Sequence, residues 1–354
     1  MASRQKRSAP SAGQLVFAGF DGASPPEPLL RLVSAGRLGG VVLFSRNVES
    51  PEQLRELVVR LHDAAPRGSP LVVGVDQEGG RVQRLRDPWT EWPALRAVGE
   101  LDRVEETRRF GEALARELAD LGVDLDFAPC VDVDTHPDNP VIGDRSLGAD
   151  AERVARHGAA LVEALQGAGV AACAKHFPGH GDTTVDSHVA LPRVPHGLER
   201  LRAVELVPFR AAVRAGVASV MTAHLLVPAL DPDRPATLSP RVLELLRGEL
   251  GFRGLLFSDD LEMGAVAGLG SPAELAEGAI LAGVDAVLFC SRLEAAAEAV
   301  EALESLSEAR VAPALARMAR FKRGHAGGRH RRKRLPPYPE HRRLARRLGG
   351  TGPA

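Results

Sequence analysis

The sequence predicts a single (β/α)8 TIM-type barrel, an α/β fold. Eight short apolar runs recur along the 354 residues, and segments with helical amphipathic periodicity separate most of them. Strands that are apolar throughout are typical of parallel sheets buried on both faces, and their alternation with helices predicts an α/β architecture. Eight such units favour closure into a barrel, and the chain exceeds the roughly 250 residues that this fold needs. A doubly wound open sheet is the alternative.

The apolar runs give the eight predicted strands in chain order. They are residues 14–20, 39–44, 71–75, 124–128, 170–174, 218–222, 254–257 and 285–289. Amphipathic periodicity predicts helices over residues 51–62, 104–121, 151–168, 198–215, 240–250, 272–282 and 293–306. Three of these helices begin with a serine followed by proline, at Ser50-Pro51, Ser239-Pro240 and Ser271-Pro272. A capping hydroxyl followed by proline at the first helical position is a start signal.

Charge divides the chain into an acidic body and a basic end. The net charge is −1, but residues 322–354 carry eleven Lys or Arg against one acid, Glu340. We therefore predict a flexible N-terminus over residues 1–12, the catalytic barrel over residues 13–320, and a basic, disordered tail over residues 321–354. The tail is expected to be a solvated extension, with nucleic acid or an anionic surface as the less favoured partner.

The cysteines and the hydropathy pattern predict the compartment. Cys130, Cys173 and Cys290 lie in or beside apolar runs, and an odd number without paired spacing indicates a reducing environment. The basic N-terminus is not followed by the apolar stretch of a signal peptide, and no window approaches the roughly 20 apolar residues of a membrane span. We expect a cytoplasmic monomer without membrane association.

One stretch concentrates titratable side chains at the end of a predicted strand. The run 170–174 ends in Lys175 and His176 and opens into a loop that contains Pro178, Gly179 and Gly181. The same loop carries His180, Asp182, Asp186 and His188. A packed interior has little use for so many polar groups, whereas a barrel presents its catalytic groups where its strands end.

Polar groups also follow the other predicted strands. They occupy residues 76–84 after the third strand, residues 129–145 after the fourth, His224 after the sixth, and residues 258–263 after the seventh. Because the C-terminal ends of parallel strands meet on one face of a barrel, this distribution predicts a single active site there.

The segment Lys175-His-Phe-Pro-Gly-His-Gly-Asp-Thr183, followed by Asp186-Ser-His188, resembles the signature of the β-N-acetylglucosaminidases of glycoside hydrolase family 3. The resemblance covers roughly residues 10–300, and five separated motifs agree in order. It implies a retaining exo-β-N-acetylglucosaminidase that hydrolyses terminal β-linked N-acetylglucosamine without a cofactor or a metal. The absence of a second predicted domain resembles the single-domain bacterial enzymes of peptidoglycan recycling, which implies muropeptide substrates. Leu85 departs from the pattern, because many relatives carry phenylalanine there.

A retaining glycosidase needs a nucleophile and a separate acid/base. Asp259 and Asp260 end an apolar run, and because consecutive strand residues point to opposite sides, only one of them is expected to face the substrate. The residues alone do not decide between them; the resemblance assigns the nucleophile to Asp259 and leaves Asp260 a capping or supporting role. It likewise assigns the acid/base to His188, paired with Asp186. An imidazole suits proton transfer near neutrality, and a carboxylate partner would orient it.

The resemblance further assigns sugar binding to Asp76, Arg145, Lys175 and His176. A carboxylate such as Asp76 can accept hydrogen bonds from two adjacent hydroxyls. Arg81 either belongs to the same sugar-binding group or pairs with Glu78, and the ion pair is the favoured interpretation. His224 is a weaker candidate and is interpreted as a hydrogen-bonded polar group at a strand end. Met263 either contacts the sugar or packs under Asp259, and packing is the favoured interpretation.

Three alternatives remain beside this interpretation. A metal-dependent hydrolase could use His176, His180, Asp182 and His188, but four-residue spacing in a Gly/Pro loop lacks helical geometry, so we predict insensitivity to chelators. A non-catalytic sugar-binding or nucleic-acid-associated protein conflicts with the intact set of acidic and histidine residues. A β-N-acetylglucosaminide phosphorylase is the third alternative, since some relatives with a histidine acid/base use phosphate in place of water.

Overall fold

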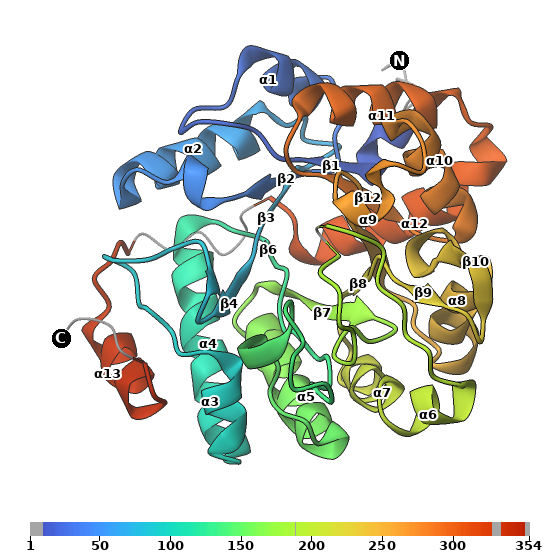
Figure 1. Ribbon diagram of the computed structural model, residues 1–354. Coiled ribbons are helices and arrows are strands. Elements are labelled where there is room, and N and C mark those ends of the chain that lie inside the picture. The colour runs from blue at the N-terminus through green and yellow to red at the C-terminus, as the bar shows by residue number, and fades with distance from the viewer. Residues whose placement is uncertain (1–9, 188, 328–333, 351–354) are drawn as a thin grey trace, which may run out of the picture.

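The structure, a computed structural model, describes residues 10–187, 189–327 and 334–350. Eight parallel strands form a closed barrel in the order β1-β12-β11-β8-β7-β6-β3-β2 (Figure 1). The strands are β1 (Val16–Ala18), β2 (Gly40–Leu43), β3 (Val72–Val75), β6 (Leu125–Asp126), β7 (Ala171–Phe177), β8 (Ser219–Thr222), β11 (Leu255–Asp260) and β12 (Ala286–Phe289). Each lies in one of the eight predicted runs or overlaps it. The predicted fold class is therefore confirmed, and the open sheet is excluded.

Two short antiparallel ribbons lie outside the barrel and were not predicted. The strand β4 (Gln77–Gly79) pairs with β5 (Val82–Gln83), and β9 (Leu226–Val227) pairs with β10 (Asp231–Pro235). Both follow barrel strands directly, so each ribbon places additional side chains near the C-terminal ends of the strands.

Helices surround the barrel (Figure 1). They are α1 (Glu27–Ser34), α2 (Pro51–Ala64), α3 (Leu95–Glu100), α4 (Val104–Leu121), α5 (Ala151–Gly167), α6 (Leu198–Ala203), α7 (Leu206–Arg214), α8 (Pro240–Glu244), α9 (Gly264–Ala267), α10 (Pro272–Ala282), α11 (Leu293–Ser305), α12 (Glu308–His325) and α13 (Pro339–Arg347). The bounds of α4 and α10 are those predicted, whereas the predicted helix 198–215 is divided into α6 and α7. The predicted helix 240–250 continues beyond α8 as a π-helical segment, η5 (Leu245–Glu249).

Capping hydroxyls set the starts of three helices, as the sequence predicts. The Ser50 hydroxyl accepts a hydrogen bond from the Gln53 amide, at 3.1 Å, and Ser239 caps α8 in the same way. In α10 the capping is reciprocal, because Ser271 accepts from the Glu274 amide while the Glu274 carboxylate accepts from the Ser271 amide.

A cluster of aromatic side chains packs inside the barrel. Phe257 of β11 packs edge-on against Phe17 of β1 and Phe127 after β6, with ring centroids 5.0 and 5.4 Å apart. Gly40 of β2 lies against the same cluster, because a Cβ there would be 2.1 Å from the Phe17 ring. Phe321 of α12 adds a further ring to the cluster, with its centroid 6.3 Å from that of Phe257.

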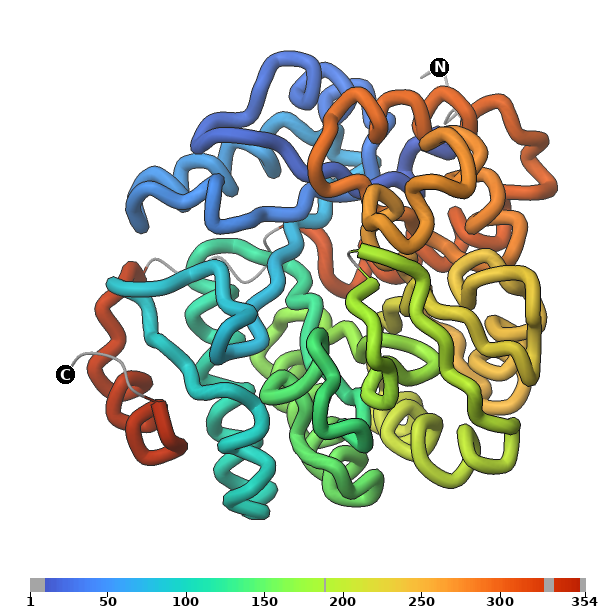
Figure 2. The backbone as a smooth tube through the Cα atoms, in the orientation of Figure 1, coloured from blue at the N-terminus to red at the C-terminus, as the bar shows by residue number. Residues whose placement is uncertain are grey.

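The C-terminal segment differs from the prediction. Residues 321–325 complete α12, and α13 packs against α4, as the red helix at the end of the traced chain shows in Figure 2. The described part of segment 321–354 is therefore not a disordered tail; residues 328–333 and 351–354 lie outside the described residues.

Specific contacts explain why α13 is folded. Tyr338 is buried and donates a hydrogen bond to Asp120 of α4, at 3.1 Å. His341 stacks on the Tyr338 ring and bonds Glu117 at 2.8 Å. Buried partners on α4 thus compensate for the high charge of the segment.

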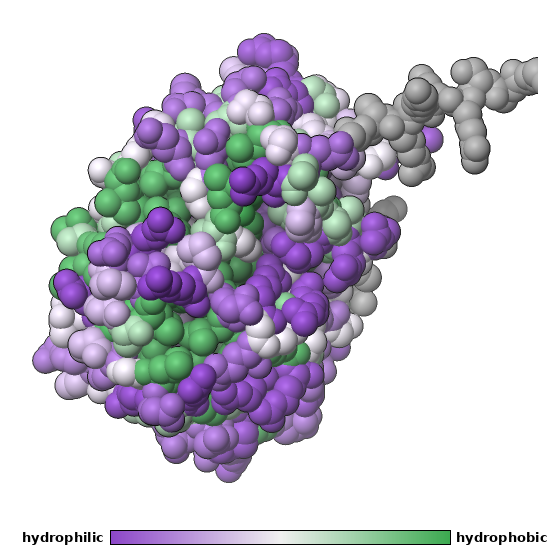
Figure 3. Space-filling model, turned by 90° about the vertical axis from the view of Figure 1, so that its right-hand side faces the viewer, coloured by the Kyte–Doolittle hydropathy of each residue, from purple (hydrophilic) through white to green (hydrophobic). Residues whose placement is uncertain are grey.

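The surface is polar, with apolar side chains in separate areas. Figure 3 shows this on the side where α8 and α10 lie. In the described residues, the exposed large apolar side chains are Leu101, Val185, Val189, Leu269 and Leu281. No helix within the described ranges is long and apolar enough to cross a membrane.

Candidate active site

A cavity of about 320 Å³ opens at the C-terminal ends of the barrel strands. It brings together six of the seven predicted site residues: Asp76, Arg145, Lys175, His176, Asp186 and Asp259. The seventh, His188, lies outside the described residues. A larger hollow of about 700 Å³ lies between α1 and α2 on the outer surface, far from this set, and no histidine or aspartate pair lines it.

A buried ionic network forms one wall of the cavity. Lys175 of β7 contacts Asp76 at 2.7 Å and Glu78 at 2.6 Å. Arg145 approaches Glu78 through two nitrogens, at 2.8 and 2.9 Å. Burial alone would raise the pKa of Glu78, but the charges of Arg145 and Lys175 hold it below its usual value. Both carboxylates are therefore ionised and can accept hydrogen bonds.

Glu78 supports the site from behind the cavity lining, and the sequence analysis assigned it the wrong partner. It was paired with Arg81, but Arg81 instead contacts Asp144 at 2.8 Å and donates to the backbone carbonyl of Ile142. The ribbon β4–β5 turns the Glu78 side chain toward Arg145 and Lys175. The spacing of two residues from Asp76 could have suggested that both carboxylates lie near one cation.

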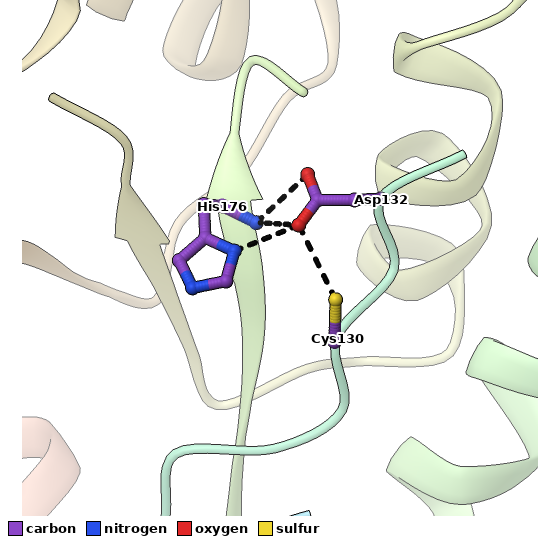
Figure 4. Close-up of side chains that lie close together, drawn as sticks. All are labelled: Cys130, Asp132 and His176. Carbon is purple, nitrogen blue, oxygen red and sulfur yellow. Dashed lines mark hydrogen bonds and ion pairs between the residues drawn. The ribbon is translucent and has the colours of Figure 1, made fainter. Parts of the chain in front are cut away.

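Asp132 orients the histidine wall of the site (Figure 4). Its carboxylate accepts hydrogen bonds from the His176 Nδ1, at 2.7 Å, and from the backbone amides of His176 and His180, at 3.1 and 2.7 Å. Burial opposes ionisation, but the two histidines lower the pKa of Asp132 to about 2. This fixes the His176 ring so that its Nε2 faces Arg145, 3.3 Å away.

Cys130 lies beside this pair, and the three residues have the donor types of a metal site. Ligand atoms of Cys130, Asp132 and His176 lie within 4.8 Å of one another. However, burial raises the pKa of the Cys130 thiol well above its usual value, and the thiol donates to Asp132 at 3.3 Å. Metals bind the thiolate, and the Asp132 oxygens already accept backbone hydrogen bonds. The cluster therefore fits a hydrogen-bonded support better than a metal centre.

The two adjacent aspartates of β11 have different surroundings. Asp259 lines the cavity, and its Oδ1 accepts a hydrogen bond from the Asp260 amide, at 2.8 Å. Asp260 also touches the cavity, but its carboxylate accepts from the backbone amides of Glu262 and Cys290, at 3.1 and 3.2 Å. Burial raises the pKa of Asp260 to about 7. Asp260 thus ties the end of β11 to the end of β12, which fits the supporting role expected for it.

Two glycines allow the loop after β7 to lie close to its neighbours. Gly179 has a φ of +131°, and a Cβ there would lie 2.8 Å from the Glu205 side chain. A Cβ on Gly181 would lie 1.9 Å from the Val133 carbonyl oxygen. Glycine is therefore needed at both positions, at Gly179 to pack the loop against the start of α7 and at Gly181 to pack it against the loop that follows β6.

His224 has structural surroundings, whereas Met263 lines the cavity. His224 Nδ1 bonds the Thr237 hydroxyl at 2.8 Å, and its Nε2 bonds the Asp260 carbonyl at 3.0 Å. Burial lowers the pKa of His224, so its ring is neutral. Met263 lines the cavity, and its amide donates to the Asp260 carbonyl at 3.1 Å.

Comparisons with known proteins agree on one family. Residues 12–321 match the model of the glycosyl hydrolase family 3 N-terminal domain. A beta-hexosaminidase of Nitrosomonas eutropha is 43% identical over 267 residues, which cover 74% of this chain and 76% of that protein. A solved family 3 β-N-acetylglucosaminidase from a Paenibacillus species superposes with a TM-score of 0.89 at 39% identity, covering 95% of this chain and 67% of that one.

A solved structure with a bound sugar analogue is also similar. NagZ from Neisseria gonorrhoeae, in complex with N-trifluoroacetyl-D-glucosamine, superposes with a TM-score of 0.80 at 34% identity, covering 88% of this chain and 90% of that one. Together with the closed barrel and the carboxylates that line its cavity, these matches show that the chain is a glycoside hydrolase and belongs to glycosyl hydrolase family 3.

Proposed function

We propose that the protein is a retaining exo-β-N-acetylglucosaminidase that removes terminal β-linked N-acetylglucosamine. The observation that carries this proposal is the single cavity in which Asp259, Asp186 and the four predicted sugar-binding residues meet. The beta-hexosaminidase of Nitrosomonas eutropha and the Paenibacillus β-N-acetylglucosaminidase support the sugar specificity.

In the proposed first step, an Asp259 oxygen attacks the anomeric carbon and forms a covalent glycosyl ester. The bond to the leaving oxygen breaks with its electron pair, and His188, paired with Asp186, donates a proton to that oxygen. In the second step, the now neutral imidazole removes a proton from water. The water oxygen attacks the anomeric carbon, and Asp259 leaves as a carboxylate, so the configuration is retained.

The ionic network would bind the sugar that takes part in these steps. Asp76 is held ionised by Lys175 and can accept hydrogen bonds from two neighbouring hydroxyls. Arg145 would donate to a further sugar oxygen, whereas the His176 Nε2 would accept from a hydroxyl, since the His176 Nδ1 donates to Asp132 and its Nε2 accepts from Arg145. A rigid set of ionised partners favours orientation of the sugar ring without rearrangement of the protein.

Muropeptide fragments in the cytoplasm are the natural substrate that we propose, and we propose a monomer as the acting species. The test is product analysis with a 4-nitrophenyl β-N-acetylglucosaminide, the matching glucoside and a muropeptide. Cleavage of the glucoside alone would refute the sugar assignment. Release of a sugar phosphate when phosphate is added would replace the hydrolase with a phosphorylase.

The covalent step has its own test. The alternative is attack by the substrate's own acetamido group, for which an adjacent acidic pair is typical. We expect a slow 5-fluoro glycoside to label one peptide, at Asp259. Asp259→Ala is expected to lower kcat by about 10⁴-fold or more, whereas Asp260→Ala retains measurable activity. The absence of a labelled peptide, combined with strong inhibition by a thiazoline, would establish the substrate-assisted mechanism instead.

A further inference from the structure

Ser187 is a buried residue in an otherwise exposed part of the loop after β7. Its exposed fraction is in the buried range, at 2%, while Val185 and Val189 are 39% and 77% exposed. Ser187 stands between Asp186 and His188 in the sequence. The loop therefore meets the barrel at the residue between the two proposed acid/base partners.

The side chain of Ser187 contacts a histidine that is itself firmly held. Ser187 Oγ lies 3.1 Å from His180 Nε2, and the other ring nitrogen lies 2.7 Å from the Thr183 hydroxyl. The His180 amide donates to Asp132 at 2.7 Å. Burial, with a smaller contribution from the nearby His176, lowers the pKa of His180 to about 4, so the ring is neutral and has one donor and one acceptor nitrogen.

The direction of the Ser187 hydrogen bond follows from the other contacts. Thr183 donates its hydroxyl hydrogen to the His180 carbonyl, at 3.1 Å. Thr183 can then only accept from His180 Nδ1, which leaves Nε2 as the acceptor. We therefore assign the Ser187 hydroxyl as the donor to Nε2.

The backbone of Ser187 makes a second contact, on the side of the nucleophile. Its carbonyl accepts a hydrogen bond from the Ala265 amide, at 3.1 Å. Ala265 belongs to α9, which begins at Gly264, shortly after Asp259 in the sequence. Ser187 thus contacts His180, which lies near the start of the same loop and is itself bonded to Asp132 after β6. Through α9 it also contacts the β11 side of the cavity.

We propose that Ser187 is a positioning residue, which with His180 and the Ala265 amide fixes the loop segment that carries the acid/base pair relative to Asp259. This inference rests on the proposed function. The nucleophile comes from a barrel strand, whereas the acid/base comes from a loop with exposed side chains. Proton transfer needs hydrogen-bond geometry, so the loop requires a fixed point close to the acid/base. The two contacts of Ser187 provide that point.

The proposal predicts a loss that depends on the leaving group. For Ser187→Ala, kcat/KM should fall about 10- to 100-fold on N,N′-diacetylchitobiose, whose leaving oxygen needs a proton. On a 2,4-dinitrophenyl glycoside, which departs without protonation, the loss should be about threefold or less. Ser187→Cys, which keeps a weak donor, should lie between Ser187→Ala and the wild type and provides a second variant if Ser187→Ala folds poorly.

Two further variants separate positioning from general stability. Ser239 is also a buried serine, and its hydroxyl bonds Asp231 at 2.7 Å and caps α8 away from the cavity. Ser239→Ala should lower Tm and leave the ratio of kcat/KM between the two substrates unchanged. In a His180→Phe background, Ser187→Ala should change that ratio no further, because the two residues act through one contact.

His188→Ala, measured in parallel, distinguishes failure of this inference from failure of the proposed function. If His188→Ala shows no leaving-group dependence, the proposed acid/base is wrong. If His188→Ala shows it and Ser187→Ala lowers activity equally on both substrates, or on neither, the positioning role of Ser187 is overturned. Full additivity of Ser187→Ala and His180→Phe would also overturn it.

Discussion

The barrel buries charged side chains at both ends, and among the described residues those at the C-terminal ends of the strands border the active-site cavity. At the mouth, which we define by the cavity at the C-terminal ends of the strands, Lys175 bridges Asp76 and Glu78. The Asp76 side chain remains 16% exposed and lines the cavity. At the floor, which we define by Gln14, Asp124, Asp285 and Lys322, Asp285 has no exposed side-chain surface and contacts Arg247 and Arg317 at 2.5 and 2.6 Å.

The difference shows that burial of a charge does not by itself identify a functional group. Both Asp285 oxygens are occupied, because Oδ2 also accepts from the Leu256 amide at 2.9 Å. Asp76 lies among equally strong partners but borders the space that a sugar would fill. Substitutions at the floor should therefore change stability, and substitutions at the mouth should change activity.

The largest effect on stability is expected for Asp285→Asn. Asparagine keeps the shape but leaves two arginines without a counter-charge, so the free energy of unfolding should fall by about 3 to 5 kcal/mol. Denaturant titration measures this, and kcat/KM below the transition should equal that of the wild type. A loss of kcat/KM in the folded variant would show that the floor is coupled to the site.

The converse result is expected for Asp76→Asn at the mouth. Loss of the charge would weaken the two proposed hydrogen bonds to sugar hydroxyls, and kcat/KM should fall about 100-fold. Glu78 remains to pair with Lys175, so the free energy of unfolding should change much less than in Asp285→Asn. Glu78→Gln is the matched control, with the same chemical change on the side away from the cavity. A smaller loss of kcat/KM for Asp76→Asn than for Glu78→Gln would contradict the sugar-binding assignment.

The buried Lys322 at the floor should make the free energy of unfolding depend on pH. Burial lowers the pKa of Lys322 to about 7 in the folded protein, from 10.5, although the nearby Asp124 opposes the shift. Between these pH values the unfolded chain holds a proton that the folded chain lacks, so the free energy of unfolding rises with pH by roughly 1 kcal/mol per unit. Below pH 7 this contribution is constant, and above 10.5 the penalty is absent.

The measurement is the free energy of unfolding at pH 7, 8 and 9 for the wild type and Lys322→Met. Their difference should follow the slope expected for Lys322, because the other titrating groups cancel. Arg323→Met, which removes an exposed cation one residue further along α12, should reproduce the wild-type slope. Parallel profiles for the wild type and Lys322→Met would mean that Lys322 is charged in the folded protein.

The barrel and most of the residues at its mouth could be predicted from the sequence, because both depend on short local patterns. Eight apolar runs could be recognised locally, and polar residues directly after them had to meet on one face. Glu78 and Asp132 were not recognised as partners, because their roles depend on ribbon and loop geometry beyond the strand ends. The spacing of Glu78 from Asp76 suggests a shared cation, but the local sequence does not show which residue supplies it.

The C-terminal segment was mispredicted because its partners are distant in sequence. Arginines dominate the composition of 339–347, while the buried positions Tyr338, His341 and Leu344 recur only every third residue. Glu117 and Asp120, which satisfy them, lie more than 200 residues earlier. Both acids lie on the buried side of α4, where an amphipathic helix normally carries apolar residues. Their position on that side was the sequence feature that could have predicted a polar segment packed against α4.

The smallest effect is expected for Tyr338→Phe, which extends the comparison to the outside of the barrel. The Tyr338 hydroxyl donates to Asp120 at 3.1 Å, and its loss should lower the free energy of unfolding by about 1 kcal/mol. Because this contact lies on α4 and not at the cavity, kcat/KM should be unchanged. A double-mutant cycle with Asp120→Ala isolates the contact: coupling between the two substitutions is expected, since each removes the same hydrogen bond. Zero coupling together with an unchanged Tm would mean that α13 does not depend on this contact, and a loss of kcat/KM would place the C-terminal segment in communication with the mouth.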